Sequence, residues 1–252
     1  MCDCPHTPGP GWQGWQDLPP APPLQPVGDW VDLSHPLSAD APRVPSFPAP
    51  VFDLIRQMPR DPLNVTRMQM VVHIGTHIDS PRHFFLDAPA MEDIPINRLC
   101  GRGIVWPVAL NAAKLIEPHH LAGLEERLAP GDALVLETGW HTRAGSEAYD
   151  NDHPTLSLEC ADWLLTQRIR MLALDLPTPD LPVRKRPEGF DFPIHKRLLQ
   201  RGVLIAEHVT NLAQLRGKTV ELVCAALNIT GADGAPARIL AREIAAPPLN
   251  AA

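Results

Sequence analysis

The chain has 252 residues, a formal net charge of −7 and a hydrophobic content of 44%. This length can bury one large core or two small ones, and the acidic balance disfavours nucleic acid and anionic membrane surfaces as partners. No apolar run reaches the roughly 18 residues that a membrane span needs, so we expect no membrane-spanning segment.

The cysteine pattern indicates the redox environment. The five cysteines are Cys2, Cys4, Cys100, Cys160 and Cys224. An odd number without a regular pattern favours reduced thiols, and the N-terminus has no basic region followed by an apolar core. We therefore expect a cytoplasmic protein. Cys2 and Cys4 have no second pair nearby, which disfavours a metal site at that end.

The first 28 residues are rich in proline and glycine, with Pro-Pro-Ala-Pro-Pro at positions 19–23. Such a composition predicts a disordered or extended tail. Its tryptophans, Trp12 and Trp15, either dock on a neighbouring subunit or stay in solvent, and the second is favoured. Residues 30–35 then read as the first strand, and the proline-broken residues 36–62 as loop.

Residues 73–83 contain three histidines and an aspartate, His73, His77, Asp79 and His83. An apolar lead-in predicts a strand, whose alternation puts His73, His77 and Asp79 on one face. A straight strand would hold His73 and His77 roughly 13 Å apart, at about 3.3 Å per residue. That separation is long for two ligands of one ion, but Gly75 lies between them and permits a bend. Imidazole and carboxylate together suit zinc, manganese or iron.

Further along the chain, apolar patterning alternates between strand and helix periods, with Gly, Pro and Ser at the boundaries. The predicted strands cover residues 103–110, 132–139, 171–175, 203–207 and 220–229. The predicted helices cover residues 118–128 and 158–168, together with a stretch that begins at His195 and ends at Gly202. From residue 232 we expect an irregular chain. This succession predicts an α/β or α+β domain.

The segment from His73 to His83 resembles the signature His-x-Gly-Thr-His-x-Asp-x-Pro-x-His of the cyclase-like metal hydrolases, at every fixed position. This family includes bacterial kynurenine formamidases and isatin hydrolases, and the similarity extends from about Val31 to near Ile229. The resemblance implies a single swivelling β/β/α-type domain with mixed sheets, which we place at residues 29–245 after the tail of residues 1–28. Because family members are commonly dimers or tetramers, a homodimer or homotetramer is expected.

His195 and Glu207 lie twelve residues apart, and neither alone indicates a site. Together they resemble the distal ligand pair of the family. The resemblance therefore implies Zn²⁺, or alternatively Mn²⁺, held by His73, His77, Asp79, His195 and Glu207. The simplest partition has two ions that share Asp79, although a single ion stays open. Asp175 and Asp180 follow a strand in a turn, where caps are favoured over ligands.

His83 is then left as the catalytic proton carrier, since imidazole titrates near neutral pH. A metal-activated water would attack a carbonyl carbon, and His83 would protonate the leaving nitrogen. Phe47 by resemblance and Phe84 by its position next to His83 are the expected substrate contacts, with ordinary packing as the alternative for both. The expected reaction is amide hydrolysis of a small aromatic substrate, with N-formylkynurenine as the best single candidate. Ring opening of a cyclic amide or lactone and non-catalytic metal binding are the alternatives.

Overall fold

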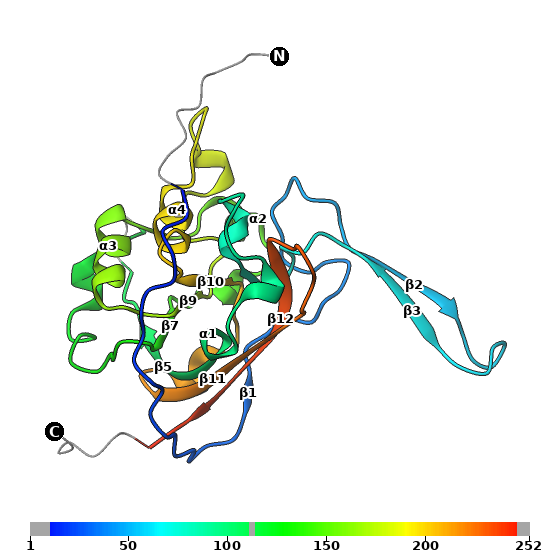
Figure 1. The fold of residues 1–252 in the computed structure, drawn as a ribbon. Helices are drawn as coiled ribbons and strands as arrows, with labels where there is room; N and C mark the ends of the chain where they lie inside the picture. The colour runs from blue at the N-terminus through cyan, green and yellow to red at the C-terminus, as the bar shows by residue number, and fades with distance from the viewer. Residues whose placement is uncertain (1–10, 111–113, 246–252) are drawn as a thin grey trace.

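The computed structural model describes residues 11–110 and 114–245 (Figure 1). Within these ranges the strands are β1 (Val31–Asp32), β2 (Val51–Arg56), β3 (Val65–Gln69), β4 (His77–Asp79), β5 (Cys100–Pro107), β6 (Leu115–Ile116), β7 (Ala133–Glu137), β8 (Thr155–Leu156), β9 (Met171–Leu174), β10 (Leu204–Glu207), β11 (Thr219–Ala226) and β12 (Gly234–Glu243). The α-helices are α1 (Ile96–Leu99), α2 (Glu147–Asn151), α3 (Leu158–Thr166) and α4 (Pro193–Leu199). Short 3₁₀ turns lie at Pro81–His83, Met91–Asp93, Pro118–Leu121, Trp140–Arg143, Val183–Lys185 and Leu212–Leu215.

One sheet organises the domain, in the strand order β1-β12-β11-β5-β7-β9-β10-β4. Because β4 also pairs with β12, the strands from β12 to β4 close into a ring, and β1 lies beside the later part of β12. The strands β5, β7, β9 and β10 run parallel to one another, whereas the pairings of β4, β11 and β12 are antiparallel. The mixed α/β fold predicted from the sequence is confirmed.

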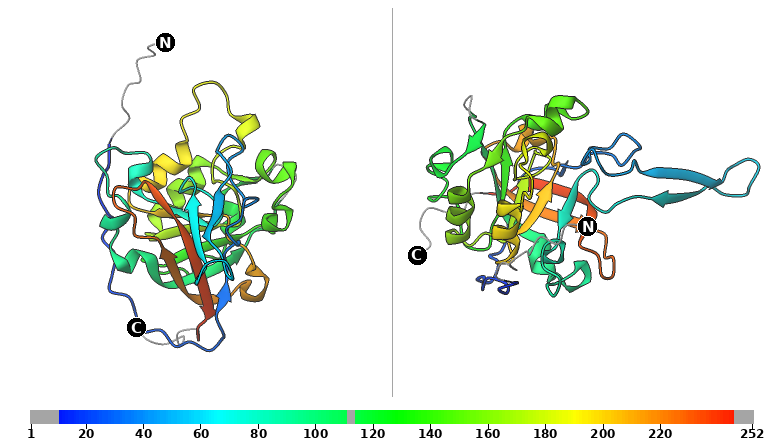
Figure 2. Two further views of the ribbon diagram at one scale, coloured as in Figure 1. Left: turned by 90° about the vertical axis from the view of Figure 1, so that its right-hand side faces the viewer. Right: turned by 90° about the horizontal axis from the view of Figure 1, so that it is seen from above.

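The central strands are buried on both faces, which explains their nearly continuous apolar sequences. Alternate residues belong to different clusters: Leu134 and Ile205 pack with the helices α3 and α4, whereas Val135 and Ala206 pack in a second cluster shared with β11 and β12. Figure 2 shows the two helices on one side of the sheet. This double cover holds the ends of β4 and β10, where the candidate site lies, on a rigid base.

The described part of the tail, residues 11–28, has an extended chain with one isolated bridge, between Pro26 and Ile244. It lies against the domain: the backbone nitrogen of Gln13 donates to the carbonyl of Gln200 at 3.1 Å, and Trp15 packs partly buried against the second cluster. The extended conformation agrees with the prediction, but the favoured solvent-exposed state is wrong for Trp15, which packs against its own domain. Residues 1–10 of the predicted tail, with Cys2 and Cys4, lie outside the described residues.

Besides small shifts at element ends, three stretches form another type of element than predicted. Residues 234–243, expected to be irregular, form β12, because Pro and Gly in this stretch occupy strand positions that tolerate them beside the short β4. Residues 118–128 contain only one 3₁₀ turn, Pro118–Leu121, because the backbone leaves the helical path at Ala122, with ψ 132°, and Gly123 follows at φ +86°. Residues 51–56, expected to be loop, form β2.

The strands β2 and β3 form a hairpin that projects from the body, which we call the arm (Figure 1). Cross-strand pairing puts Phe52 opposite Met68 and Leu54 opposite Thr66 on one face, while Asp53 pairs with Arg67 on the other. Phe52, Leu54 and Met68 are 37%, 45% and 46% exposed. An isolated two-stranded hairpin is marginally stable in water, so this apolar face has the character of a contact surface.

Candidate metal centre

The ladder between β4 and β10 brings the two halves of the site together. Glu207 pairs directly with His77, and Ile205 pairs with Asp79, although these residues are far apart in the sequence. His195 comes from the first turn of α4, whose backbone nitrogens at Ile194 and His195 lack partners within the helix and donate to the two oxygens of Asp180 at 3.0 and 3.1 Å. The helix therefore begins where Asp180 holds it.

The bend expected at Gly75 is present. Gly75 adopts φ +62°, and β4 begins only at His77, so His73 lies before the strand rather than on it. The ring centroids of His73 and His77 are 5.2 Å apart, far closer than a straight strand allows. A glycine at the bend thus converts a spacing unsuited to one centre into a compact cluster.

Asp79 is the middle of this cluster. Its Oδ1 lies 2.8 Å from His73 Nδ1 and 3.4 Å from His77 Nε2, while its Oδ2 lies 3.5 Å from His195 Nε2. Glu207 spans the same gap, with Oε2 at 3.4 Å from His77 Nε2 and Oε1 at 3.2 Å from His195 Nε2. The two oxygens of Asp79 face the two groups that a shared bridging carboxylate would serve.

The donor atoms fit a metal ion. Ligands about 2.0–2.1 Å from a tetrahedral zinc lie roughly 3.4 Å from one another, which is the spacing between the imidazole nitrogens and the carboxylate oxygens. Asp79 Oδ2 and Glu207 Oε1 are buried and have no hydrogen-bond partner among the described residues. Buried, unpaired carboxylate oxygens are costly, and a cation between them removes that cost.

The electrostatics of the protein alone also call for positive charge here. Burial lowers the pKa of His73, but hydrogen bonds to Asp233 and Asp79 outweigh it and raise the pKa to about 10. Burial likewise lowers the pKa of His195, but the hydrogen bond to Asp180 and the adjacent carboxylates of Asp79 and Glu207 outweigh it and raise this pKa well above its usual value. Protons on these imidazoles balance the carboxylates in the absence of a cation, and a bound metal would replace them.

The nitrogen of each expected ligand that faces away from the centre has its own acceptor. His77 Nδ1 lies 2.8 Å from the carbonyl of Gly75, His195 Nδ1 lies 2.6 Å from Asp180 Oδ2, and His73 Nε2 lies 2.8 Å from Asp233 Oδ2. Such outer contacts select the tautomer of a metal-binding histidine. Asp180 holds both the helix and its histidine, which agrees with the expected capping role.

Sequence reasoning missed His208, which forms a possible metal-binding group with His77 and Glu207, and it also missed Asp233. Asp233 follows β11 in a segment expected to be irregular, and no spacing relates it to the histidines 150 or more residues earlier. The available signal was the turn-forming Gly231 and Gly234 on either side of a carboxylate. Tertiary structure places it beside His73 and His83.

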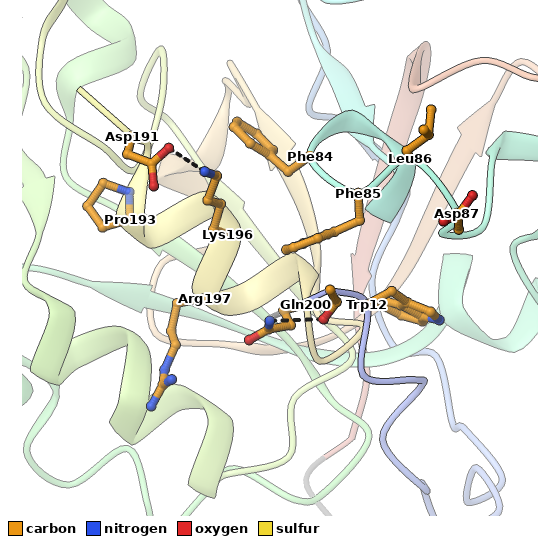
Figure 3. A pocket seen from close by; sticks show the side chains of 11 residues that line it. Trp12, Phe84, Phe85, Leu86, Asp87, Asp191, Pro193, Lys196, Arg197 and Gln200 are labelled. Carbon is orange, nitrogen blue, oxygen red and sulfur yellow. Dashed lines mark hydrogen bonds and ion pairs between the residues drawn. The ribbon is translucent and has the colours of Figure 1, made fainter. Parts of the chain in front are cut away.

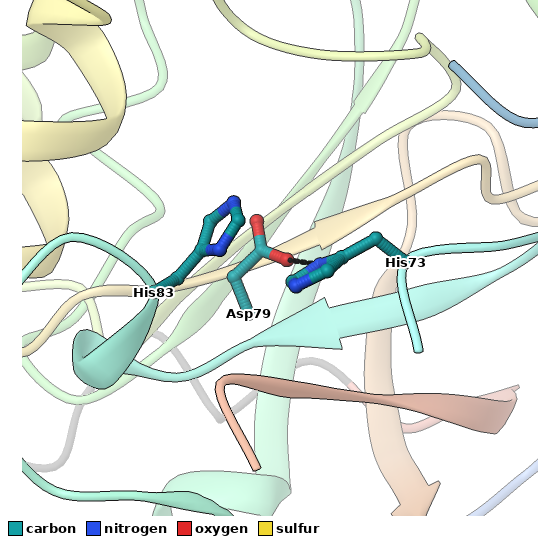
Figure 4. A group of neighbouring side chains, drawn as sticks. All are labelled: His73, Asp79 and His83. Atoms are coloured by element: carbon teal, nitrogen blue, oxygen red, sulfur yellow. Dashed lines mark hydrogen bonds and ion pairs between the residues drawn. The ribbon is translucent and has the colours of Figure 1, made fainter. Parts of the chain in front are cut away.

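His83 lies close to this cluster, at the end of the 3₁₀ turn Pro81–His83 (Figure 4). Its ring is 4.0 Å from that of His73, centroid to centroid, and its side chain is 27% exposed, more than the side chains of the expected ligands. Together with His73 and Asp79 it also forms a group that could hold an ion. The geometry therefore suits His83 both as an accessible proton carrier and as a ligand.

Phe84 and Phe47 differ in their surroundings. The Phe84 ring centroid lies 4.6 Å from that of His83 and 5.1 Å from that of His195, so this ring covers the centre. Phe84 also lines a pocket of about 500 Å³ with Phe85, Trp12 and residues of α4 (Figure 3). Phe47 lies in a turn, where its carbonyl accepts from Arg43. None of the five expected ligands lines the pocket. Phe84 connects the two, because it lines the pocket and its ring also contacts His83 and His195.

Comparison with known proteins defines the class. Residues 31–181 match the model of the family described as "Putative cyclase". Because this match spans more than half of the chain, the chain belongs to the cyclase family. It resembles the kynurenine formamidases of Bacillus cereus (28% identical over 222 residues) and Bacillus mycoides (29% identical over 222 residues), each alignment covering 86% of this chain and 99% of the relative.

Solved structures share the fold. An isatin hydrolase bound to the product analogue thioisatinate gives a TM-score of 0.78 at 22% identity, covering 86% of this chain and 93% of that one. A structure titled as a potential metal-dependent hydrolase with cyclase activity gives 0.71 at 25% identity, covering 86% and 98%. The chain is therefore a cyclase-family hydrolase with a cluster suited to metal. Within residues 11–110 and 114–245, no helix is long and apolar enough to span a bilayer.

Proposed function

We propose that this protein is a metal-dependent amide hydrolase of the kynurenine formamidase type, which cleaves N-formylkynurenine to kynurenine and formate. The observation that carries the proposal is the buried cluster in which Asp79 Oδ2 and Glu207 Oε1, both unpaired, face His195. The similarity to curated kynurenine formamidases over 86% of the chain supports the substrate class.

We assign the metal to His73, His77, Asp79, His195 and Glu207, as Zn²⁺ or alternatively Mn²⁺, with one or two ions per chain. When bound, such an ion supplies Lewis acidity and an activated water at neutral pH. His77, Asp79, His195 and Glu207 lie at the mutual spacing of the ligands of one ion, and His73, on Oδ1 of Asp79, leaves room for a second. The protein itself orients the imidazoles through Gly75, Asp180 and Asp233.

His83 is the proposed proton carrier. It is the most exposed histidine of the cluster, so it can reach a substrate that approaches from solvent. A proton delivered from its ring to the departing nitrogen makes an aniline rather than an anilide ion leave, which is the hard part of amide cleavage. Phe84, over His83 and His195, offers a face on which an aromatic substrate stacks.

We also propose that two copies of the chain associate through the arm. Its apolar face continues at the base into a groove of about 500 Å³ lined by Met68, Leu37 and Leu227, among others. A ridge and a recess on one surface suit an isologous contact, in which each copy presents both. The described cysteines are free thiols, which supports the cytoplasmic location proposed from the sequence.

The function is tested by measuring hydrolysis of N-formylkynurenine, formanilide, isatin and an aromatic lactone by the metal-replete protein. The proposal expects the highest kcat/KM for the formyl-anilides. Preferential opening of isatin or the lactone would move the protein to the ring-opening class, for which the same cluster suffices. Absence of turnover on all four, with metal bound, would contradict the proposal.

A further inference from the structure

The loop before β12 carries a carboxylate that touches both kinds of histidine in the centre. Asp233 Oδ2 lies 2.8 Å from His73 Nε2 and 3.2 Å from His83 Nδ1. The two rings are tilted by 32° with their centroids 4.0 Å apart, so one oxygen serves the edges of both. We propose that Asp233 is a positioning residue that holds an expected metal ligand, His73, and the expected proton carrier, His83, in one arrangement.

This assignment rests on the proposed function, and it goes beyond the residues that the motif contains. A carboxylate accepts hydrogen bonds and does not donate them, so both imidazoles present an N–H to Asp233. For His73 this leaves Nδ1 to face Asp79 and the centre. For His83 it leaves Nε2 as the nitrogen that exchanges a proton with the substrate. One carboxylate thus selects the tautomer of the ligand and of the acid–base group.

The backbone around Asp233 is held independently of the histidines. The carbonyl of Asp233 accepts from the Ser80 nitrogen at 3.0 Å, and the carbonyl of Ala232 accepts from the Met91 nitrogen at 3.0 Å. The Gly231 nitrogen donates to the carboxylate of Glu92 at 2.8 and 2.9 Å. The loop is therefore anchored at three points, so its carboxylate has a defined place rather than a range of surface positions.

Gly234, the residue after Asp233, lets the backbone of this loop contact the His73 ring directly. Gly234 pairs with Asp79, and a Cβ at this position would lie 2.5 Å from His73 Cε1 and 2.8 Å from the Ile78 carbonyl. Only a glycine lets the imidazole rest against the backbone at this distance. The pairing of Gly234 with Asp79 thus also fixes the position of Asp233, the residue that precedes Gly234.

An ordinary surface ion pair is the competing explanation, because the Asp233 side chain is 44% exposed and such pairs contribute little. Three features oppose it. Both partners belong to the centre, one of them is only 8% exposed, and the same oxygen serves both. An incidental pair would need none of these.

The test compares Asp233→Asn with Glu92→Gln, a control that alters an anchor of the same loop without touching either imidazole. With metal saturating, Asp233→Asn should lower kcat for formanilide by about 10- to 100-fold with little change in KM, and Glu92→Gln should stay within about twofold. In a competition with a chelator, Asp233→Asn should lower metal affinity by about 10- to 100-fold. Thermal melting establishes that each variant is folded.

A double-mutant cycle identifies the route through His83. In a His83→Ala background, Asp233→Asn should cost no more than about a further twofold in kcat, because the group that it positions is already absent. Additive losses, an unchanged metal affinity, or equal losses in Glu92→Gln would each overturn the proposal. If the unaltered protein hydrolyses none of the substrates, the proposed function fails, and the chelator competition still decides whether Asp233 holds His73.

Discussion

At the scale of single residues, the metal-binding geometry of the centre depends on the direction in which individual donor atoms point. Asp79 sends one oxygen toward His73 and His77 and the other toward His195, and a substitution by asparagine or glutamate would alter both groups at once. The identity of the ligands follows from residue type, but their partition follows from these orientations. Two substitutions separate ligand from proton carrier.

The first prediction concerns His77. Its Nε2 lies 3.4 Å from both Asp79 Oδ1 and Glu207 Oε2, so His77→Ala removes a donor in contact with both carboxylates. We expect the purified variant to retain less than about half of the metal of the unaltered protein, measured by elemental analysis, with activity lost in parallel. Asp53→Ala, which removes an exposed carboxylate on the arm, is the control. If His77→Ala keeps the full metal content, His77 is not a metal ligand.

The second prediction concerns His83. If it carries the proton, His83→Ala should keep its metal while kcat for an anilide falls by about 10²- to 10⁴-fold. The loss should be smaller for an activated ester, because an alkoxide or phenoxide leaves with less need of a proton. Metal content and both rates are measured on the same preparation. Loss of metal together with equal damage to ester and anilide turnover would make His83 a ligand instead.

At the scale of elements, short pieces of structure do the positioning. The three-residue strand β4 pairs with β10 and β12 at once, so it carries two ligands while its neighbours carry Glu207 and Asp233. The helix α4 contributes His195 from a first turn held by Asp180. By contrast, the arm contains none of the expected ligands and projects away from the body (Figure 1).

The third prediction tests the arm as an interface. Phe52→Glu together with Leu54→Glu puts two charges on its apolar face, where burial against a second copy would be strongly unfavourable. We expect the molar mass from light scattering to fall to that of the monomer. The control, Asp53→Ala with Arg67→Ala, changes the opposite face of the same strands. If the apolar-face variant keeps the mass of the unaltered protein, the arm is not the interface.

At the scale of the whole molecule, closure of the sheet and the course of the tail determine stability. Residues 11–28 cross the domain surface, where Arg98 lies 5.0 Å from the Trp15 ring centroid. A Cβ on Gly202 would come within 2.5 Å of Trp15, so this glycine leaves the space that the indole occupies. The tail therefore acts as an outer strap on a domain whose core clusters consist of other residues.

The fourth prediction concerns this strap. Deletion of residues 1–28 should leave the domain folded, because the buried clusters lie within the later chain. The Tm should nevertheless fall by about 5–10 °C, because burial of the Trp15 side chain contributes roughly 2–3 kcal/mol to stability. Trp15→Ala should reproduce most of the decrease. An unchanged Tm in both variants would show that the contact contributes nothing.

The fifth prediction concerns acid stability. His153 is buried, and burial is the main cause that lowers its pKa to about 4, below the usual 6.5. The unfolded chain then binds more protons between these two values, so stability present above pH 6.5 is lost as the pH falls toward 4. Between about pH 7 and 4.5 the free energy of unfolding, measured in urea, should fall in both proteins. The fall should be smaller in His153→Gln by roughly 2–3 kcal/mol. His119→Gln is the control, and identical slopes would contradict the assignment.

The candidate cluster could be predicted from the sequence because four of its members are close together in the chain. His73, His77, Asp79 and His83 lie within eleven residues, and the conformational freedom of Gly75 sufficed to predict the bend. The buried strands were also predictable, since short apolar runs bounded by turn residues are too short for most helices and are typical of buried strands. The resemblance to a family then extended the set to His195 and Glu207.

Tertiary structure alone decided what local patterning does not encode. β12 carries Gly and Pro that weaken a strand signal, and it forms because β4 and β11 offer partners on both sides. Asp233 enters the centre through the same pairing, far along the chain from the histidines that it touches. Residue types and short spacings therefore determined the chemistry available to this protein. Strand pairing, which depends on the closure of the whole sheet, decided which side chains meet.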